Sequence, residues 1–209
     1  MKSKHMVVAG ILFLTATAAL QAAGKELVLI EKGRPRAMII LPAGAGARSV
    51  EAEAGRILSD HLLLMSGARL QIRREDELGP ATVEAARATF PRQGEHDAFI
   101  LVGESNVARQ LGFTSEGLGP GGILVKTSGN VLALLGPSAE SDNGGTRHAV
   151  IEFLESFGVR YLWPGETGRV IPKSDTLAAG PIELRFTPPI GQRRIRISRM
   201  GDRSLSGLA

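Results

Sequence analysis

Apolar residues recur along the chain with two different periods, and the longer period marks two helices. One segment begins at Val50 and ends before Gly67, and the other ends at Gly158. In both, apolar side chains return every three to four residues, which places them on one face of a helix. Glycine directly after such a segment favours the left-handed backbone that ends a helix. The pattern therefore predicts two main helices, one in each half of the chain.

Shorter apolar runs, bounded by turn-forming residues, predict strands. Ser128-Gly129-Asn130 lies between two such runs and favours an antiparallel hairpin. Lys32-Gly33-Arg34-Pro35 favours a turn between the first two runs. Residues 106–111 predict a short helix, whereas residues 75–96 have no sustained period and predict a loop that could hold a short helix over 81–88. The predicted strands are 27–30, 37–41, 69–73, 99–102, 123–126, 131–135, 159–162, 170–171 and 182–186.

The order of these elements predicts an α+β fold, or a mixed α/β fold. Helices and strands follow one another without strict alternation, so a wholly parallel sheet is not expected. We expect a mixed β-sheet with two main helices packed on it. A chain of 209 residues is long enough for one such domain with its own core.

The N-terminus has the three parts of a secretory signal. Lys2 and Lys4 precede an apolar run over residues 6–20, and small residues follow at 22–24. The sequence therefore predicts a signal peptide over 1–23 and export to the periplasm or the extracellular space. The apolar run is shorter than the roughly 20 residues that cross a bilayer, so we expect no membrane span.

Cysteine and charge narrow the function classes further. The chain has no cysteine, which excludes thiolate metal ligands and cysteine nucleophiles and leaves ordinary burial to hold an exported fold. The net charge is +4, and its excess arginines gather near the C-terminus. With one Trp, one Tyr and no stacking motif, the chain is not expected to bind nucleic acid. The arginines concerned are Arg193, Arg194, Arg196, Arg199 and Arg203.

No motif has the spacing that catalysis or metal binding requires. Glu152 and Glu155 lie three residues apart on a predicted helix and are interpreted as solvated residues beside its apolar stripe. The motif at 117–122 (GLGPGG) matches a dinucleotide fingerprint, but it precedes a strand rather than opening a helix. The sequence therefore predicts no catalytic residue, no metal site and no cofactor. The histidines are too scattered for a metal motif: His61, which lies on the core face of the first helix, His96 and His148.

A glycine-rich turn over residues 143–146 (NGGT) opens the second main helix. Backbone amides at a helix N-terminus can bind an anion such as a carboxylate or a phosphate. Gly145 and Thr146 are therefore candidate ligand-binding residues. The alternative is that Thr146 caps the helix, which is the more common role of threonine at a helix start.

A second candidate surface is the turn Trp163-Pro164-Gly165-Glu166. Glu166 could line a neighbouring site if the turn lies at a domain junction, although a purely structural turn explains it as well. Tyr161 and Trp163 are the single tyrosine and tryptophan of the chain. Trp163 and Glu166 are therefore the candidate ligand-binding residues of this turn.

Several segments, in this order, resemble one family of domains. They are 63–72 (LLMSGARLQI), 100–105 (ILVGES), 134–136 (LLG), 145–155 (GTRHAVIEFLE) and 157–166 (FGVRYLWPGE). Together they resemble the N-terminal domain of α-glucuronidases and the related second domain of β-N-acetylhexosaminidases. The same module also precedes uncharacterised glycosidase barrels.

The resemblance implies a fold and a role. In those families the module is a mixed sheet with helices packed against it, and the catalytic carboxylates lie in the (β/α)8 barrel that follows. The resemblance thus implies a module over residues 24–190, and residues 191–209 would be the stub of a barrel that this chain does not contain. A barrel site is assembled from loops after several strands, so one strand cannot build it.

The expected function is that of a non-catalytic N-terminal accessory domain in an exported glycoside hydrolase-type protein that degrades polysaccharides. Its partners would be a catalytic barrel, if a longer product exists, and a carbohydrate. A stand-alone carbohydrate-binding module is the alternative, and it would need an exposed aromatic platform at Tyr161 and Trp163. A complete small hydrolase is a third hypothesis, which the lack of a nucleophile or paired-acid motif disfavours.

Overall fold

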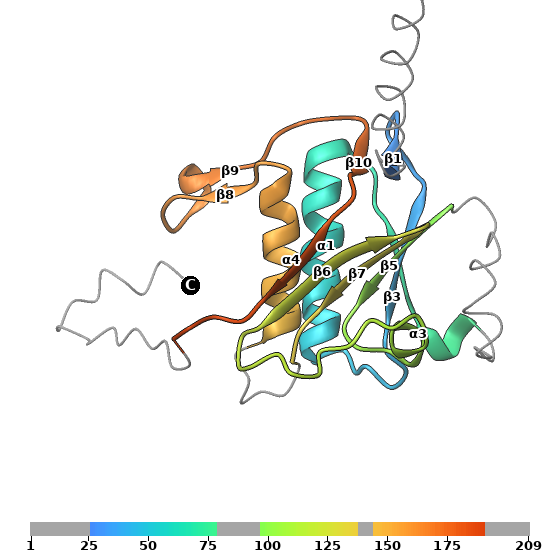
Figure 1. Ribbon diagram of the computed structural model, residues 1–209. Coiled ribbons are helices and arrows are strands. Elements are labelled where there is room, and N and C mark those ends of the chain that lie inside the picture. The colour runs from blue at the N-terminus through green and yellow to red at the C-terminus, as the bar shows by residue number, and fades with distance from the viewer. Residues whose placement is uncertain (1–25, 79–96, 138–143, 191–209) are drawn as a thin grey trace, which may run out of the picture.

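A computed structural model describes residues 26–78, 97–137 and 144–190 of the chain. Its centre is a six-stranded mixed sheet (Figure 1). Four neighbouring strands, β7, β5, β3 and β4, run parallel, while β6 is antiparallel to both of its neighbours. Across the sheet the strands are β11 (Glu183–Phe186), β6 (Ile123–Ser128), β7 (Val131–Leu135), β5 (Ala98–Val102), β3 (Ala37–Leu41) and β4 (Gln71–Arg74).

The two predicted main helices, α1 (Val50–Ser66) and α4 (Gly145–Ser156), lie side by side on one face of this sheet (Figure 1). Leu58 and Leu62 of α1 are fully buried, as is Val150 of α4, in one cluster with alternate residues of the strands. The short helix α3 (Asn106–Gln110) joins a second apolar cluster formed by the intervening strand residues. The expected α+β fold, with a mixed sheet and two main helices, is confirmed.

Glycines end both main helices as the sequence predicted. Gly67 has a φ of 78° and donates its N–H to the carbonyl oxygen of Leu63, while Gly158 has a φ of 86°. At the other end of α1, the Ser49 hydroxyl oxygen accepts a hydrogen bond from the Ala52 N–H. These local contacts satisfy backbone groups that the helix itself leaves unpaired.

A smaller sheet lies beside the main one and changes one sequence-based expectation. Its strands are β10 (Leu177–Ala179), β1 (Leu27–Glu31) and β2 (Arg34–Pro35). Residues 32–35 were expected to form the turn, but only Lys32 and Gly33 do so, with φ of 50° and 71°. Two successive positive φ angles suit a two-residue hairpin turn, so the chain reverses at once and Arg34 and Pro35 pair with β1.

A separate pair of strands forms an exposed hairpin directly after α4. It consists of β8 (Arg160–Tyr161) and β9 (Arg169–Val170), joined through the 3₁₀ turn η3 (Glu166–Gly168). In Figure 1 this hairpin projects beyond α4, away from the main sheet. No helix in the described part of the chain is long and apolar enough to cross a membrane. The expected signal peptide, the short helix over 81–88 and the barrel segment 191–209 lie outside the described residues.

A buried carboxylate joins the 3₁₀ turn η1 (Glu75–Leu78) to helix α3. Glu75 is 4% exposed, and its two carboxylate oxygens accept hydrogen bonds from the backbone N–H groups of Asn106 (3.0 Å) and Val107 (3.1 Å). The first N–H groups of a helix have no partner within it, and a negative charge is favourable at that end. Glu75 therefore holds α3 against the edge of the sheet that ends in β4.

Replacing this carboxylate tests its role. We expect Glu75→Ala to lower the free energy of unfolding by about 1–3 kcal/mol, because two backbone donors lose their acceptor. Urea unfolding followed by circular dichroism measures the change. Asp76→Ala is the control: the Asp76 side chain is 47% exposed and pairs with Arg74 at 3.4 Å, so its loss should cost less than about 0.5 kcal/mol. Equal effects of the two substitutions would contradict the assignment.

Candidate functional site

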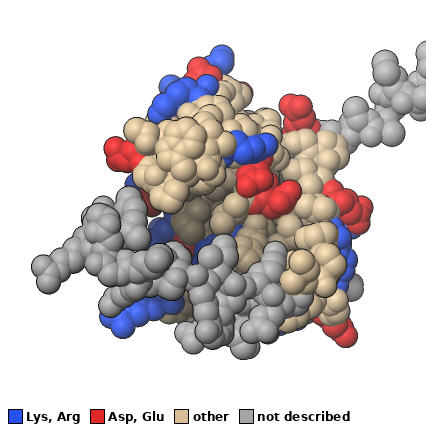
Figure 2. All heavy atoms as spheres, turned by 90° about the vertical axis from the view of Figure 1, so that its left-hand side faces the viewer, with Lys and Arg blue, Asp and Glu red and all other residues tan. Residues whose placement is uncertain are grey.

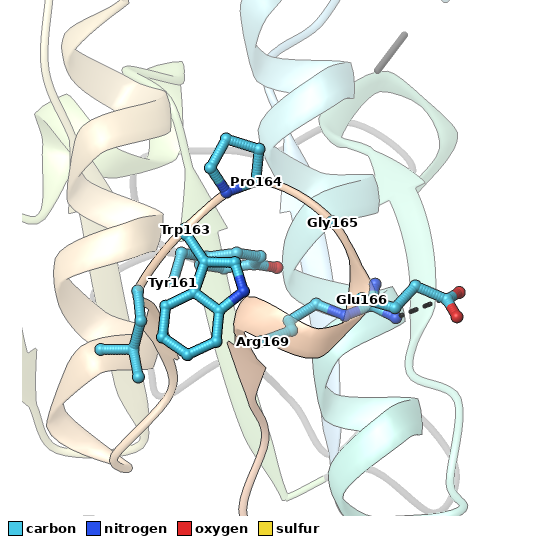
Figure 3. A pocket seen from close by; sticks show the side chains of 7 residues that line it. Tyr161, Trp163, Pro164, Gly165, Glu166 and Arg169 are labelled. Atoms are coloured by element: carbon cyan, nitrogen blue, oxygen red, sulfur yellow. Dashed lines mark ion pairs between the residues drawn. The ribbon is translucent and has the colours of Figure 1, made fainter. Parts of the chain in front are cut away.

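The β8–β9 hairpin presents a group of exposed apolar side chains. Tyr161, Leu162 and Trp163 are 57%, 62% and 54% exposed, although large apolar residues are usually buried. They line a shallow depression of about 640 Å³ (Figure 3). Neighbouring exposed apolar side chains with a polar rim are typical of a binding surface. The residues that complete the lining are Pro164, Gly165, Glu166 and Arg169.

Backbone contacts hold the turn of the hairpin closed. The Leu162 N–H donates to the Gly168 carbonyl oxygen at 2.8 Å, and the Trp163 indole N–H donates to the Thr167 hydroxyl oxygen at 3.3 Å. Gly168 packs so tightly that a Cβ there would lie 2.0 Å from the Trp163 carbonyl oxygen. Only glycine allows this close approach. The ring of Trp163 is therefore attached to a compact turn while much of its surface stays in solvent.

The rim of the depression carries one charge of each sign. Glu166 pairs with Arg169 at 3.8 Å, and the Glu166 side chain is 94% exposed (dashed line in Figure 3). A pair this exposed contributes little to stability. Both groups are thus available to donate or accept hydrogen bonds beside an apolar surface. Aromatic side chains with adjacent polar groups suit a ligand that has apolar and hydroxyl-bearing faces.

The structure brings two of the four predicted site residues together and separates the other two. Trp163 and Glu166 line the same depression beyond the C-terminal end of α4. Gly145 and Thr146 are buried at the opposite end of that helix. A helix of twelve residues is about 18 Å long, so the two pairs do not form one site.

Gly145 and Thr146 are engaged with the end of strand β7. The Thr146 hydroxyl donates to the Gly136 carbonyl oxygen at 2.9 Å, and the Gly145 N–H donates to the Pro137 carbonyl oxygen at 3.0 Å. The N-cap residue is Gly144, which has no capping side chain. The interpretation that Thr146 caps the helix is therefore wrong. Its place inside the helix directs its hydroxyl to the neighbouring strand end.

The start of α4 leaves no room for a side chain. A Cβ on Gly145 would lie 2.5 Å from the Gly122 carbonyl oxygen and 2.8 Å from Pro137 Cδ. A Cβ on Gly136 would lie 2.4 Å from the Gly145 carbonyl carbon. Glycines from three segments therefore meet at one point: Gly122 just before β6, Gly136 just after β7 and Gly145 at the start of α4.

The close packing at Gly145 predicts that one added methyl group lowers the stability of the fold. Gly145→Ala should lower the free energy of unfolding by about 1–3 kcal/mol, because backbone atoms must move to admit the Cβ. Thermal unfolding by calorimetry measures it. The control is Gly180→Ala, where a Cβ would meet nothing within 4 Å. A glycine in such open space tolerates alanine without loss. If Gly145→Ala were as stable as Gly180→Ala, the close packing would not limit stability.

A polar cluster that the sequence analysis did not single out lies just after strand β5. Glu104 accepts hydrogen bonds from the Ser115 N–H (2.8 Å) and the Ser115 hydroxyl, and Arg109 approaches it at 3.5 Å. Burial by itself would raise the pKa of Glu104, but the hydrogen bonds from Ser115 and Arg109 outweigh it and lower the pKa. The carboxylate thus fastens the loop around residue 115 to the end of β5. Its position after a predicted strand was the one signal available in the sequence.

The lowered pKa predicts a dependence of stability on pH. A carboxyl with a lowered folded-state pKa stabilises the protein above its unfolded-state pKa, and this contribution is lost as the pH falls through the folded-state value. The wild type should therefore be more stable than Glu104→Gln at neutral pH. The difference should shrink once the pH falls below the ordinary range of glutamate. Urea unfolding at several pH values measures it, and a difference that is constant with pH would contradict the prediction.

The remaining predicted features have these places in the structure. Residues 117–122 form a loop before β6, as expected. Glu152 and Glu155 are exposed on α4, which confirms that they are solvated. Both ring nitrogens of His61 have a partner, which confirms the expectation of a half-buried, satisfied histidine. Within residues 26–78, 97–137 and 144–190, no group of three His, Asp or Glu side chains could hold a metal ion.

Comparisons of the chain with protein-family models and with curated proteins gave no match. The family resemblance noted in the sequence segments therefore stays a prediction. The hairpin depression is the described feature whose chemistry best suits a ligand, since it combines exposed aromatic rings with a charged rim.

Proposed function

We propose that this chain is a non-catalytic N-terminal accessory domain of an exported glycoside hydrolase-type protein that takes part in polysaccharide breakdown. The observation that carries the proposal is the exposed aromatic hairpin, in which Tyr161 and Trp163 lie beside Glu166 and Arg169. The residues that suggested a family resemblance include this same stretch, 157–166. We therefore assign the hairpin as the saccharide-contacting part of the domain.

The chemistry of the depression matches a sugar ring. Pyranose rings have an apolar face of C–H groups, which can lie on the exposed ring of Trp163, and an equatorial rim of hydroxyl groups. Those hydroxyls can donate to the Glu166 carboxylate and accept from the Arg169 guanidinium. Hydrogen bonds to charged groups are stronger than those between neutral groups. One short hairpin thus offers both kinds of contact that a saccharide needs.

The described residues of the depression do not supply the pair of groups that hydrolysis needs. Glycoside hydrolysis usually needs two carboxyl groups on either side of the scissile bond. Among the described residues, one carboxylate, that of Glu166, lines the depression. Binding without cleavage is therefore the activity that these residues support, and a catalytic partner would have to supply the acid and the nucleophile or base.

The place of the hairpin fits a domain junction. In Figure 1 the chain leaves strand β11 toward the side from which the hairpin projects, and Ile190 at the end of the described residues is 62% exposed. Figure 2 looks onto this side, where uncharged residues lie among acidic and basic side chains. A catalytic (β/α)8 domain that continues from this point would lie near the hairpin, and Glu166 could then line its site.

The same hairpin supports a second candidate function. A stand-alone carbohydrate-binding module would use Tyr161 and Trp163 as its platform. The two proposals differ in affinity: a self-sufficient module should bind an oligosaccharide with a Kd of about 1 µM to 100 µM, whereas half of a shared site should bind with a Kd in the millimolar range.

Trp163 provides a direct test because it is the single tryptophan of the chain. Titration with xylohexaose or chitohexaose should change its fluorescence, and the Kd separates the two proposals. By calorimetry or NMR titration, Trp163→Ala should weaken binding at least about tenfold, since a central aromatic contact is lost.

Phe186→Ala is the matched control for this substitution. Phe186 is an aromatic residue of β11 with a similar exposure, 48%, and it does not line the depression. Its replacement should leave the affinity unchanged. Equal losses in the two variants, or no response of Trp163 to either sugar, would contradict the saccharide role of the hairpin. Release of 4-nitrophenol from nitrophenyl glycosides by the purified chain would contradict the non-catalytic role.

A further inference from the structure

The side chains of Tyr161 and His61 link the hairpin to helix α1. The Tyr161 hydroxyl of β8 is hydrogen bonded to Nε2 of His61, which lies in the C-terminal half of α1. The two rings also meet edge to face, with centroids 5.9 Å apart and an interplanar angle of 67°. Two residues separated by 100 positions in the sequence thus join the hairpin to the helical layer.

The second ring nitrogen of His61 fixes the direction of this bond. Nδ1 lies 2.7 Å from the carbonyl oxygen of Ile57, one turn earlier in the same helix. A carbonyl oxygen can only accept, so Nδ1 carries a proton, and in the neutral imidazole with this tautomer Nε2 is an acceptor. The Tyr161 hydroxyl therefore donates to Nε2. The bond to Ile57 also fixes the orientation of the imidazole ring, so Nε2 is held in position to accept from the Tyr161 hydroxyl.

Tyr161 lines two concave surfaces. One is the hairpin depression beside Trp163, and the other is an apolar groove of about 230 Å³ between α1 and α4. A rotation of the tyrosine ring would therefore change both surfaces at once. The residues that line the groove are Ile57, His61, Ile151, Leu154, Glu155, Val159 and Tyr161.

The hairpin has few other means of keeping its orientation. It is a two-stranded ribbon whose four paired residues, Arg160, Tyr161, Arg169 and Val170, are all exposed. Ribbons of two strands are marginally stable without further packing. At its base, Arg160 Nη1 donates to the carbonyl oxygens of Glu155 and Val159, both at 2.7 Å. These bonds hold the start of β8, whereas the bond to His61 holds the aromatic ring itself.

We infer that His61 is a positioning residue for the saccharide-contacting hairpin, acting through the Tyr161 hydroxyl. The inference rests on the proposed function of the depression. His61 itself does not line the depression; it holds the ring of Tyr161, and with it the adjacent Trp163, in the orientation that a sugar meets. Loss of this contact should therefore loosen the platform without removing any group that touches the sugar.

The first test needs no sugar. His61→Ala and Tyr161→Phe should each lower the fluorescence anisotropy of Trp163 and raise its quenching by acrylamide, because the hairpin gains motion. His61→Gln should restore the wild-type values, since the Gln oxygen can replace Nε2 as the acceptor for the Tyr161 hydroxyl. Asp60→Ala is the matched control on the same helix: it removes an exposed ion pair with Arg69 (2.9 Å) and should change neither value.

The second test uses the sugar found to bind in the wild type, xylohexaose or chitohexaose. His61→Ala and Tyr161→Phe should each weaken binding about 3- to 10-fold, the effect of one hydrogen bond, while His61→Gln and Asp60→Ala bind as the wild type does. The double variant His61→Ala with Tyr161→Phe should bind no more weakly than either single variant, because both remove the same interaction.

A spectroscopic signature separates positioning from general stabilisation. In ¹⁵N NMR spectra, the wild-type His61 ring should show a protonated Nδ1 and a hydrogen-bonded Nε2, and Tyr161→Phe should shift the Nε2 resonance alone. Should His61→Ala fail to fold, as judged by thermal unfolding, Tyr161→Phe and His61→Gln provide the same comparisons. Wild-type anisotropy and wild-type affinity in both His61→Ala and Tyr161→Phe would overturn the inference.

The two proposals fail in different ways. If neither sugar binds the wild type while His61→Ala still lowers the anisotropy of Trp163, His61 positions the hairpin and the saccharide function is wrong. If a sugar binds in a Trp163-dependent manner and the His61 variants change neither anisotropy nor affinity, the saccharide function stands and the positioning role is wrong.

Discussion

The architecture depends on the burial of three central strands on both of their faces. Every residue of β3, β5 and β7 is buried, so these strands cannot lie at a surface. A strand that is apolar on both faces needs a covering layer on each side, which is typical of parallel strands. Helices α1 and α4 cover one face, and α3 with the loops around Phe113 and Leu118 packs against the other. This requirement places α1 and α4 side by side. The β8–β9 hairpin follows α4 in the chain, so the placement of α4 also sets the position of the hairpin.

The packing of α1 beside α4 also determines where the β8–β9 hairpin lies. Helix α4 ends at the same level as the later part of α1, and the chain then turns at Gly158 into the hairpin. His61 of α1 is therefore within reach of Tyr161, and the apolar groove between the helices borders the hairpin. Packing of the two helices thus brings residues from distant parts of the sequence to one surface. The side chains proposed to contact sugar are exposed and belong to neither of the two apolar clusters of the core.

Local patterns in the sequence predicted the two main helices and the strands of the main sheet, but not strands β2 and β10 or the contacts between elements. The glycines after α1 and α4 marked the helix ends correctly, because a left-handed residue is a local requirement. The exposure of Trp163 and Glu166 agreed with their place in a turn. The Glu75 bonds to α3 and the His61–Tyr161 bond were not predictable, since they join residues about 30 and 100 positions apart. The role of Thr146 was misjudged for the same reason: its hydroxyl partner, Gly136, lies just after β7 rather than in its own helix.

The crowded glycines at the start of α4 give the two ends of this helix different tolerance to sequence change. At Gly145, backbone atoms of three segments are in contact, and almost any substitution must displace them. At the other end, the hairpin is attached by side chains and surrounded by solvent. Mutations can therefore accumulate in the hairpin while the helix start stays fixed. Sequence change in the hairpin can therefore alter the binding surface while the packing of the sheet and the two helices stays the same.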